Sequence, residues 1–77
     1  MEKIIVFGVG NELERMLLRK YFVEYEIVAF CDNNCKKWGQ EYEEKIIISP
    51  DKIQEYSYDK IMITTKLYED EIREQLI

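Results

Sequence analysis

Two glycines stand where a protein backbone could approach a phosphate. Gly8 and Gly10 lie between an apolar run at residues 3–7 and a helical pattern that begins at Asn11. In such a turn the first glycine permits the tight bend, and the second lets the backbone approach an anion without a Cβ in the way. The amides of Asn11 and Glu12 would then point at the phosphate, helped by the helix dipole. The alternative is that both glycines only make a tight turn between strand and helix.

A carboxylate that could bind a ribose follows the glycine turn at a suitable distance. Asp32 closes a second apolar run, at residues 26–31, and an acidic residue about 20 positions past such a turn is expected to accept a hydrogen bond from a ribose hydroxyl. Asn33 follows it, and Thr64 ends a later run that we expect beside the glycine turn. The alternative is that Asp32 and Asn33 only end a strand and that Thr64 caps a helix.

Three residues near the turn argue against tight binding of a pyrophosphate. The full fingerprint G-x-G-x-x-G has a third glycine, which permits close packing of helix on strand, and Leu13 occupies that position here. Glu12 and Glu14 add negative charge beside the expected phosphate. These residues also suit an interaction domain that has lost its ligand.

Composition narrows the classes of function. The 77-residue chain has a net charge of −5 and no histidine. An acidic domain repels a phosphate backbone, so we expect no nucleic-acid partner. The absence of histidine removes the commonest general base and metal ligand. We expect the isolated chain to bind rather than to catalyse, and we expect no metal site.

The cysteines and the apolar runs indicate the cellular compartment in which we expect the protein. Cys31 and Cys35 are too few for the disulfide framework of a small secreted domain, so we expect reduced thiols. No apolar run reaches the roughly 20 residues that a membrane helix needs, and no signal peptide is visible. We therefore expect a cytoplasmic protein without a membrane partner.

The order of the elements predicts an α/β fold. Four strands are predicted, at residues 3–7, 26–31, 46–48 and 60–65. Helices are predicted at residues 11–22, with Asn11 as N-cap, at residues 49–56 and at residues 69–77, with a loop at residues 35–45. Strands that alternate with helices favour a parallel sheet, and right-handed crossovers give the strand order 3-2-1-4. We therefore predict one three-layer Rossmann-like domain over residues 1–77, with about four parallel strands.

Several segments together resemble a known family. They read Ile-Ile-Val-Phe-Gly-Val-Gly-Asn, Tyr-Glu-Ile-Val-Ala-Phe-Cys-Asp-Asn-Asn, Lys-Lys-Trp-Gly, Ile-Ile-Ser-Pro and Tyr-Asp-Lys-Ile-Met-Ile-Thr-Thr. In this order they resemble the N-terminal Rossmann-like domain of bacterial polysaccharide-biosynthesis proteins, which precedes nucleotide-sugar epimerases and dehydratases, acyltransferases, methyltransferases and glycosyltransferases. The resemblance implies contacts to NAD(P) or a nucleotide-sugar from the following residues: Gly8, Gly10, Asn11, Glu12 and Asp32, with Asn33 and Thr64 nearby.

Three functions are compatible with these residues. The first is a nucleotide- or nucleotide-sugar-binding module of polysaccharide biosynthesis without catalysis of its own. The second is the N-terminal part of an NAD-dependent sugar epimerase or dehydratase, or of a methyltransferase. The third is a ligand-free interaction or oligomerisation domain. Because a thin sheet leaves strand edges that invite pairing, we also expect a homodimer.

Overall fold

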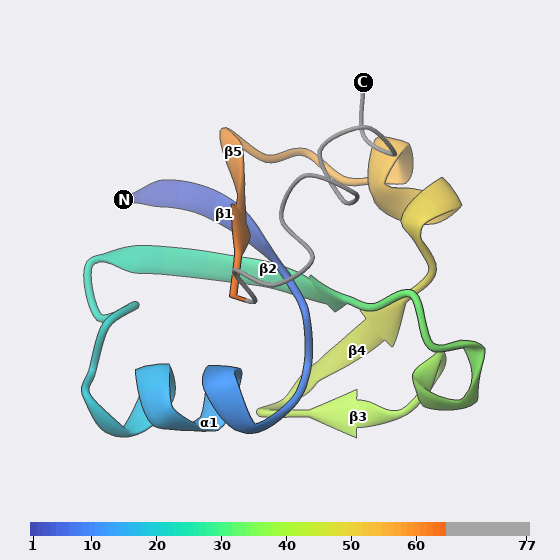
Figure 1. Ribbon diagram of the computed structural model, residues 1–77. Coiled ribbons are helices and arrows are strands. Elements are labelled where there is room, and N and C mark those ends of the chain that lie inside the picture. The colour runs from blue at the N-terminus through green and yellow to red at the C-terminus, as the bar shows by residue number, and fades with distance from the viewer. Residues whose placement is uncertain (65–77) are drawn as a thin grey trace.

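One β-sheet organises residues 1–64, the part of the chain that the computed structural model describes (Figure 1). Its strands are β1 (Glu2–Phe7), β2 (Tyr25–Cys31), β3 (Glu41–Tyr42), β4 (Lys45–Ile48) and β5 (Lys60–Ile63). One α-helix, α1 (Asn11–Leu18), and two short 3₁₀ helices, η1 (Cys35–Lys37) and η2 (Pro50–Glu55), complete the described part. Figure 1 shows α1 on one side of the sheet and η2 on the other. None of the helices in this part is long and apolar enough to cross a membrane.

The sheet is mixed, and its strands follow the order β3-β4-β2-β1-β5. β1 pairs in parallel with β2 on one side and with β5 on the other, and β2 pairs in parallel with β4. β3 runs antiparallel to β4. Because parallel strands end at one edge, the residues that follow β1, β2 and β5 come together there.

The predicted three-layer Rossmann-like domain with four parallel strands in the order 3-2-1-4 is wrong. The sheet has five strands of mixed direction, and residues 1–64 contain a single α-helix, on one face of the sheet. The fifth strand arises in the predicted loop, where β3 and β4 form a hairpin around Glu43 and Glu44. These two residues have φ values of 48° and 67°, as in the type I′ turns that usually contain Asn-Gly. Nothing in a Glu-Glu pair signals such a turn.

α1 is shorter than the predicted helix at residues 11–22. Arg19 is its C-cap, and Lys20 takes a left-handed conformation with φ 56°. The amide of Lys20 donates to Leu17 O and that of Tyr21 to Met16 O, which is the hydrogen-bond pattern of a Schellman motif. Such motifs usually have glycine at the left-handed position, and a lysine there does not signal the end of a helix.

Two apolar clusters cover the two faces of the sheet. The cluster under α1 contains Ile4, Val6, Val9, Leu13, Phe22, Phe30 and Ile47. The opposite cluster contains Ile5, Phe7, Ala29, Cys31, Ile48 and Ile53, the last from η2. Successive residues of β1 therefore point into different clusters, which explains why its sequence is apolar without alternation. The helix predicted at residues 69–77 lies outside the described residues.

Thiol labelling tests this packing at the end of β2. Cys31 and Cys35 are both free, the first buried and the second exposed. Burial, with a further contribution from the Asp32 charge, raises the pKa of Cys31 to about 12, so its thiol stays protonated at pH 8. A thiol reagent at pH 8 should therefore modify Cys35 rapidly and Cys31 only as the domain unfolds. The Cys35→Ser variant is the control, and rapid labelling of that native variant would contradict the packing.

Candidate functional site

The turn between β1 and α1 combines two different glycine conformations. Gly8 has φ 106°, a value that favours glycine, and its amide donates to Cys31 O at 2.8 Å. Gly10 is the N-cap of α1 in an extended conformation with φ −172°, which any residue adopts. A Cβ added to Gly10 would have no atom within 4 Å. Gly8 is thus required by the turn itself, whereas Gly10 leaves open space in front of the helix.

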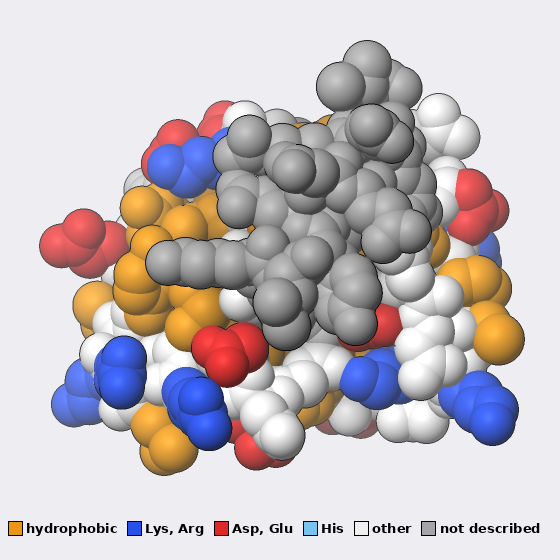
Figure 2. Space-filling model, viewed as in Figure 1, with side chains coloured by type: hydrophobic (Ala, Val, Ile, Leu, Met, Phe, Trp, Pro, Cys, Tyr) orange, Lys and Arg blue, Asp and Glu red, His pale blue; other side chains and the backbone are white. Residues whose placement is uncertain are grey.

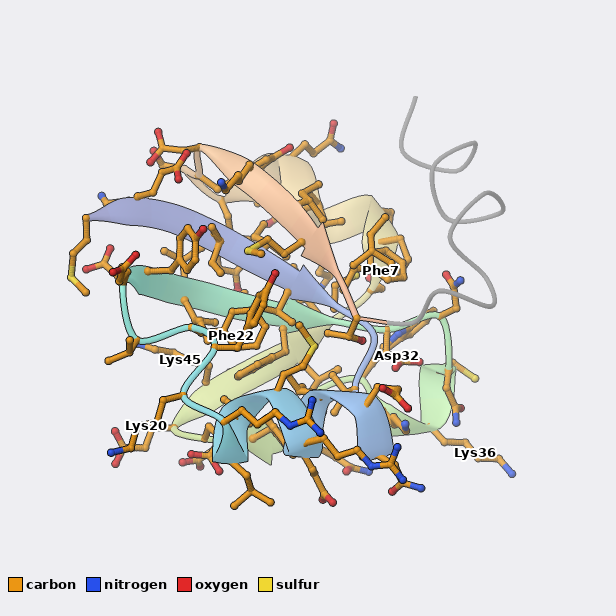
Figure 3. The ribbon with its side chains drawn as sticks, turned by 60° about the vertical axis from the view of Figure 1, so that its left-hand side comes forward. Phe7, Lys20, Phe22, Asp32, Lys36 and Lys45 are labelled. Atoms are coloured by element: carbon orange, nitrogen blue, oxygen red, sulfur yellow. The ribbon has the colours of Figure 1, made fainter. Side chains whose placement is uncertain are left out.

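Asp32 fastens this turn to the end of β2. Its Oδ2 accepts the amide of Val9 at 2.8 Å, and its Oδ1 accepts the amide of Asn34 at 2.8 Å. Its own amide donates to Ile48 O at 3.3 Å. Figure 3 shows Asp32 beside the turn into α1. The residue predicted to bind ribose therefore also holds the end of β1, the start of η1 and the end of β4 together.

Lys37 binds the other backbone polar group of Val9, its carbonyl. The sequence reasoning missed this residue. Its Nζ donates to Val9 O and lies 3.8 Å from Asp32 Oδ2. Both backbone polar groups of Val9 are therefore bound by side chains that follow β2. The position of Lys37 depends on η1, which turns the chain back toward α1, and no spacing in the sequence signals this turn. Its neighbour Lys36 points away from the site (Figure 3).

Thr64 closes the turn from the side of β5. Its side chain is buried, and its Oγ1 lies 2.7 Å from Gly8 O and 3.2 Å from Phe7 O. Its amide donates to Phe7 O at 3.0 Å. A hydroxyl has one proton to donate, and Thr64 donates it to the carbonyl groups of the turn. It supports the turn from inside and leaves no donor for a ligand.

The start of α1 faces outward without a capping side chain. The predicted N-cap, Asn11, is wrong: Gly10 occupies that position, and Asn11 is the first helical residue. Within residues 1–64 the amides of Asn11, Glu12 and Leu13 have no hydrogen-bond acceptor. The Glu12 carboxylate turns along the helix and pairs with Arg15 at 3.3 Å. Asn11 and Glu12 are exposed and Leu13 is buried, so two amide donors are available to the space in front of Gly10.

The sequence comparisons assign the chain to a family. The family model described as C2185-like, N-terminal, matches residues 1–77. The chain belongs to the C2185-like N-terminal family. No curated protein matches its sequence.

Leu13 has a structural role in this C2185-like domain. It is fully buried and packs in the cluster between α1 and the sheet, beside Val9 and Ile4. The position that holds the third glycine of the fingerprint therefore holds a core side chain. Leu13 anchors the first turn of α1 to the sheet, while Asn11 and Glu12 of that turn are exposed.

The predicted site residues of the C2185-like domain fall into two groups. Gly8, Asp32 and Thr64 form one hydrogen-bonded network with Val9 and Lys37. Gly10, Asn11, Glu12 and Asn33 are exposed around it.

Charge around the site is mixed. α1 carries two acidic residues, Glu12 and Glu14, and one basic residue, Arg15, and Figure 2 shows both signs interspersed on the surface. Residues 1–64 contain no cluster of side chains that could hold a metal ion. The arrangement offers backbone amides, one lysine and one carboxylate, which suit the binding of an anion that also carries hydroxyl groups.

Proposed function

We propose that this C2185-like domain binds a nucleotide or nucleotide-sugar at the turn between β1 and α1. In this proposal it is a cytoplasmic module of polysaccharide biosynthesis without catalysis of its own. The observation that carries the proposal is a preformed turn, held by Asp32, Lys37 and Thr64, in front of amides that lack acceptors within residues 1–64. The link to polysaccharide biosynthesis is supported by the resemblance of the sequence segments.

The phosphates would lie in front of Gly10. The amides of Asn11 and Glu12 would donate to phosphate oxygens, and the partial positive charge of the helix start would favour the anion. Lys37 brings a positive charge to the same turn beside the Asp32 carboxylate, and Arg15 pairs with Glu12. Because the turn is already held in place, binding would cost little ordering of the backbone.

The ribose would lie against Asp32. Each carboxylate oxygen offers about two acceptor sites, and the amides of Val9 and Asn34 occupy one site on each oxygen. The remaining sites can accept ribose hydroxyl protons. The Asp32 side chain is 16% exposed, so a hydroxyl can reach it from solvent.

Calorimetric titration of a small ligand panel tests the proposal. UDP, UDP-N-acetylglucosamine, NAD and coenzyme A are titrated into the full chain, and at least one should bind with a Kd below about 1 mM, or about −4.1 kcal/mol. The matched variant is Gly10→Ala, whose added Cβ enters the open space in front of the helix. Its circular dichroism should match the wild type, and its affinity should fall at least about tenfold, or about 1.4 kcal/mol. Equal affinity of both proteins would contradict binding at this turn.

A further inference from the structure

Trp38 is a half-exposed aromatic residue at the rim of the candidate site. It is the single tryptophan of the chain and follows η1 as its C-cap. Its exposed fraction is 41%, although large aromatic side chains stabilise a small domain most when they are buried. A tryptophan that stays exposed next to a candidate ligand site is a surface on which another flat ring could lie.

The ring is fixed rather than free to rotate. Its Nε1 donates to Asp32 O at 2.7 Å, and Asp32 is the residue whose carboxylate accepts the Val9 amide. One residue therefore fixes both the glycine turn and the indole ring. A ring held in this way loses little freedom when a ligand stacks on it.

The backbone around Trp38 is held as well. Its amide donates to Cys35 O at 3.3 Å, and the next amide, that of Gly39, donates to Ile47 O at 2.8 Å. The segment after η1 is therefore tied to the neighbouring strand β4. Trp38 is thus held by its side chain and by its backbone, in contrast to an ordinary exposed side chain.

The chemistry of the exposed part of Trp38 determines which part of a ligand can contact it. The indole has one hydrogen-bond donor, and Asp32 O uses it. What remains accessible is apolar ring surface, which attracts aromatic rings and does not attract a sugar hydroxyl or a phosphate. Among the parts of a nucleotide, only the base has a matching flat face.

We propose that Trp38 is the platform on which the base of the bound nucleotide stacks, next to a ribose at Asp32. This inference rests on the nucleotide-binding function proposed above and deepens it by assigning the base. Phosphate in front of Gly10, ribose at Asp32 and base on Trp38 follow the order of these groups in a nucleotide. Lys37, directly before Trp38, contacts the glycine turn, so the phosphate and base ends of the site are adjacent in the sequence.

Fluorescence of Trp38 and calorimetry test the stacking in the full chain. Because the chain has one tryptophan, its emission reports this ring alone. UDP should quench the emission with the same Kd that calorimetry gives, whereas inorganic pyrophosphate should bind with little quenching. Trp38→Leu should weaken UDP binding about ten- to hundredfold, as expected for the loss of one stacked base, and leave pyrophosphate affinity unchanged. Trp38→Phe should retain most of the UDP affinity, because it keeps a ring without the indole donor.

The outcomes separate this inference from the proposed function. If UDP binds to Trp38→Leu as tightly as to the wild type, the stacking is refuted and the nucleotide site stands. If Trp38→Phe loses as much affinity as Trp38→Leu, an aromatic ring at this position does not carry the binding, which also refutes stacking. If pyrophosphate, UDP, UDP-N-acetylglucosamine, NAD and coenzyme A all fail to bind the wild type at millimolar concentration, the proposed function fails and the stacking fails with it.

Discussion

Alanine at Gly8 is expected to lower the free energy of unfolding by about 2 kcal/mol, whereas alanine at Gly10 should change it by less than about 1 kcal/mol. Gly8 has φ 106°, a conformation that costs energy for any residue with a Cβ. Gly10 has φ −172°, and its added Cβ would meet no atom within 4 Å. The measurement is urea unfolding of both variants and the wild type, followed by circular dichroism.

The two glycine variants control each other. Both replace a glycine by the same residue in the same turn, at a buried position with positive φ in one case and at an exposed, extended position in the other. Equal losses of stability would contradict the described geometry of the turn. A Gly8→Ala variant as stable as the wild type would do the same.

The Asp32→Asn substitution is expected to cost about 2 kcal/mol of stability. The Asp32 carboxylate accepts two amides, one on each oxygen, from Val9 and from Asn34. An asparagine has one acceptor oxygen, so its NH₂ group would face an amide donor and leave that amide unsatisfied. Urea unfolding measures the loss, and amide hydrogen exchange at Val9 should become faster.

Asp59→Asn is the matched control for Asp32→Asn. Asp59 is exposed, and its Oδ2 accepts one amide, that of Lys3, at 2.7 Å. One acceptor oxygen is enough there, so the same substitution should cost less than about 0.5 kcal/mol. A loss at Asp59 equal to that at Asp32 would show that removal of negative charge, and not the pair of hydrogen bonds, sets the cost.

Strand positions were predictable because the sheet is buried on both faces. The four apolar runs predicted as strands lie close to the bounds of β1, β2, β4 and β5. Burial on both sides demands continuous apolar residues, and this signal is strong even in short segments. The end of α1 and the β3–β4 hairpin were harder to predict, because turns rather than apolar runs determine them.

Two errors in the fold share one physical cause. Lys20, Glu43 and Glu44 all have positive φ values, yet none is the glycine or asparagine that normally signals such a conformation. The first ends α1 early, and the other two form the β3–β4 hairpin. Sequence reasoning therefore extended the helix and overlooked a strand. The predicted third layer is missing for another reason, because the helix predicted at residues 49–56 is the short 3₁₀ helix η2.

The candidate site was predictable in its residues but not in its connections. Gly8, Gly10 and Asp32 were found because glycines after a strand and an acid after the next strand form a known pattern. That Asp32 binds the Val9 amide and that Thr64 binds Gly8 O depends on how the strands align. Lys37 and Trp38 reach Val9 and Asp32 through η1, a short element without a periodic signal.

Amide NMR of the isotope-labelled chain with UDP tests the central claim most directly. If a phosphate binds in front of Gly10, the largest shifts should fall on the amides of residues 10–12 and on the Trp38 indole. The amide signals of β3 and of the N-terminal end of β1, such as that of Glu2, should not shift. Saturable shifts confined to the turn and to Trp38 are the predicted result. No shift in the turn at millimolar UDP or at millimolar concentrations of the other three ligands of the panel, or shifts centred elsewhere in the domain, would contradict a nucleotide site between β1 and α1.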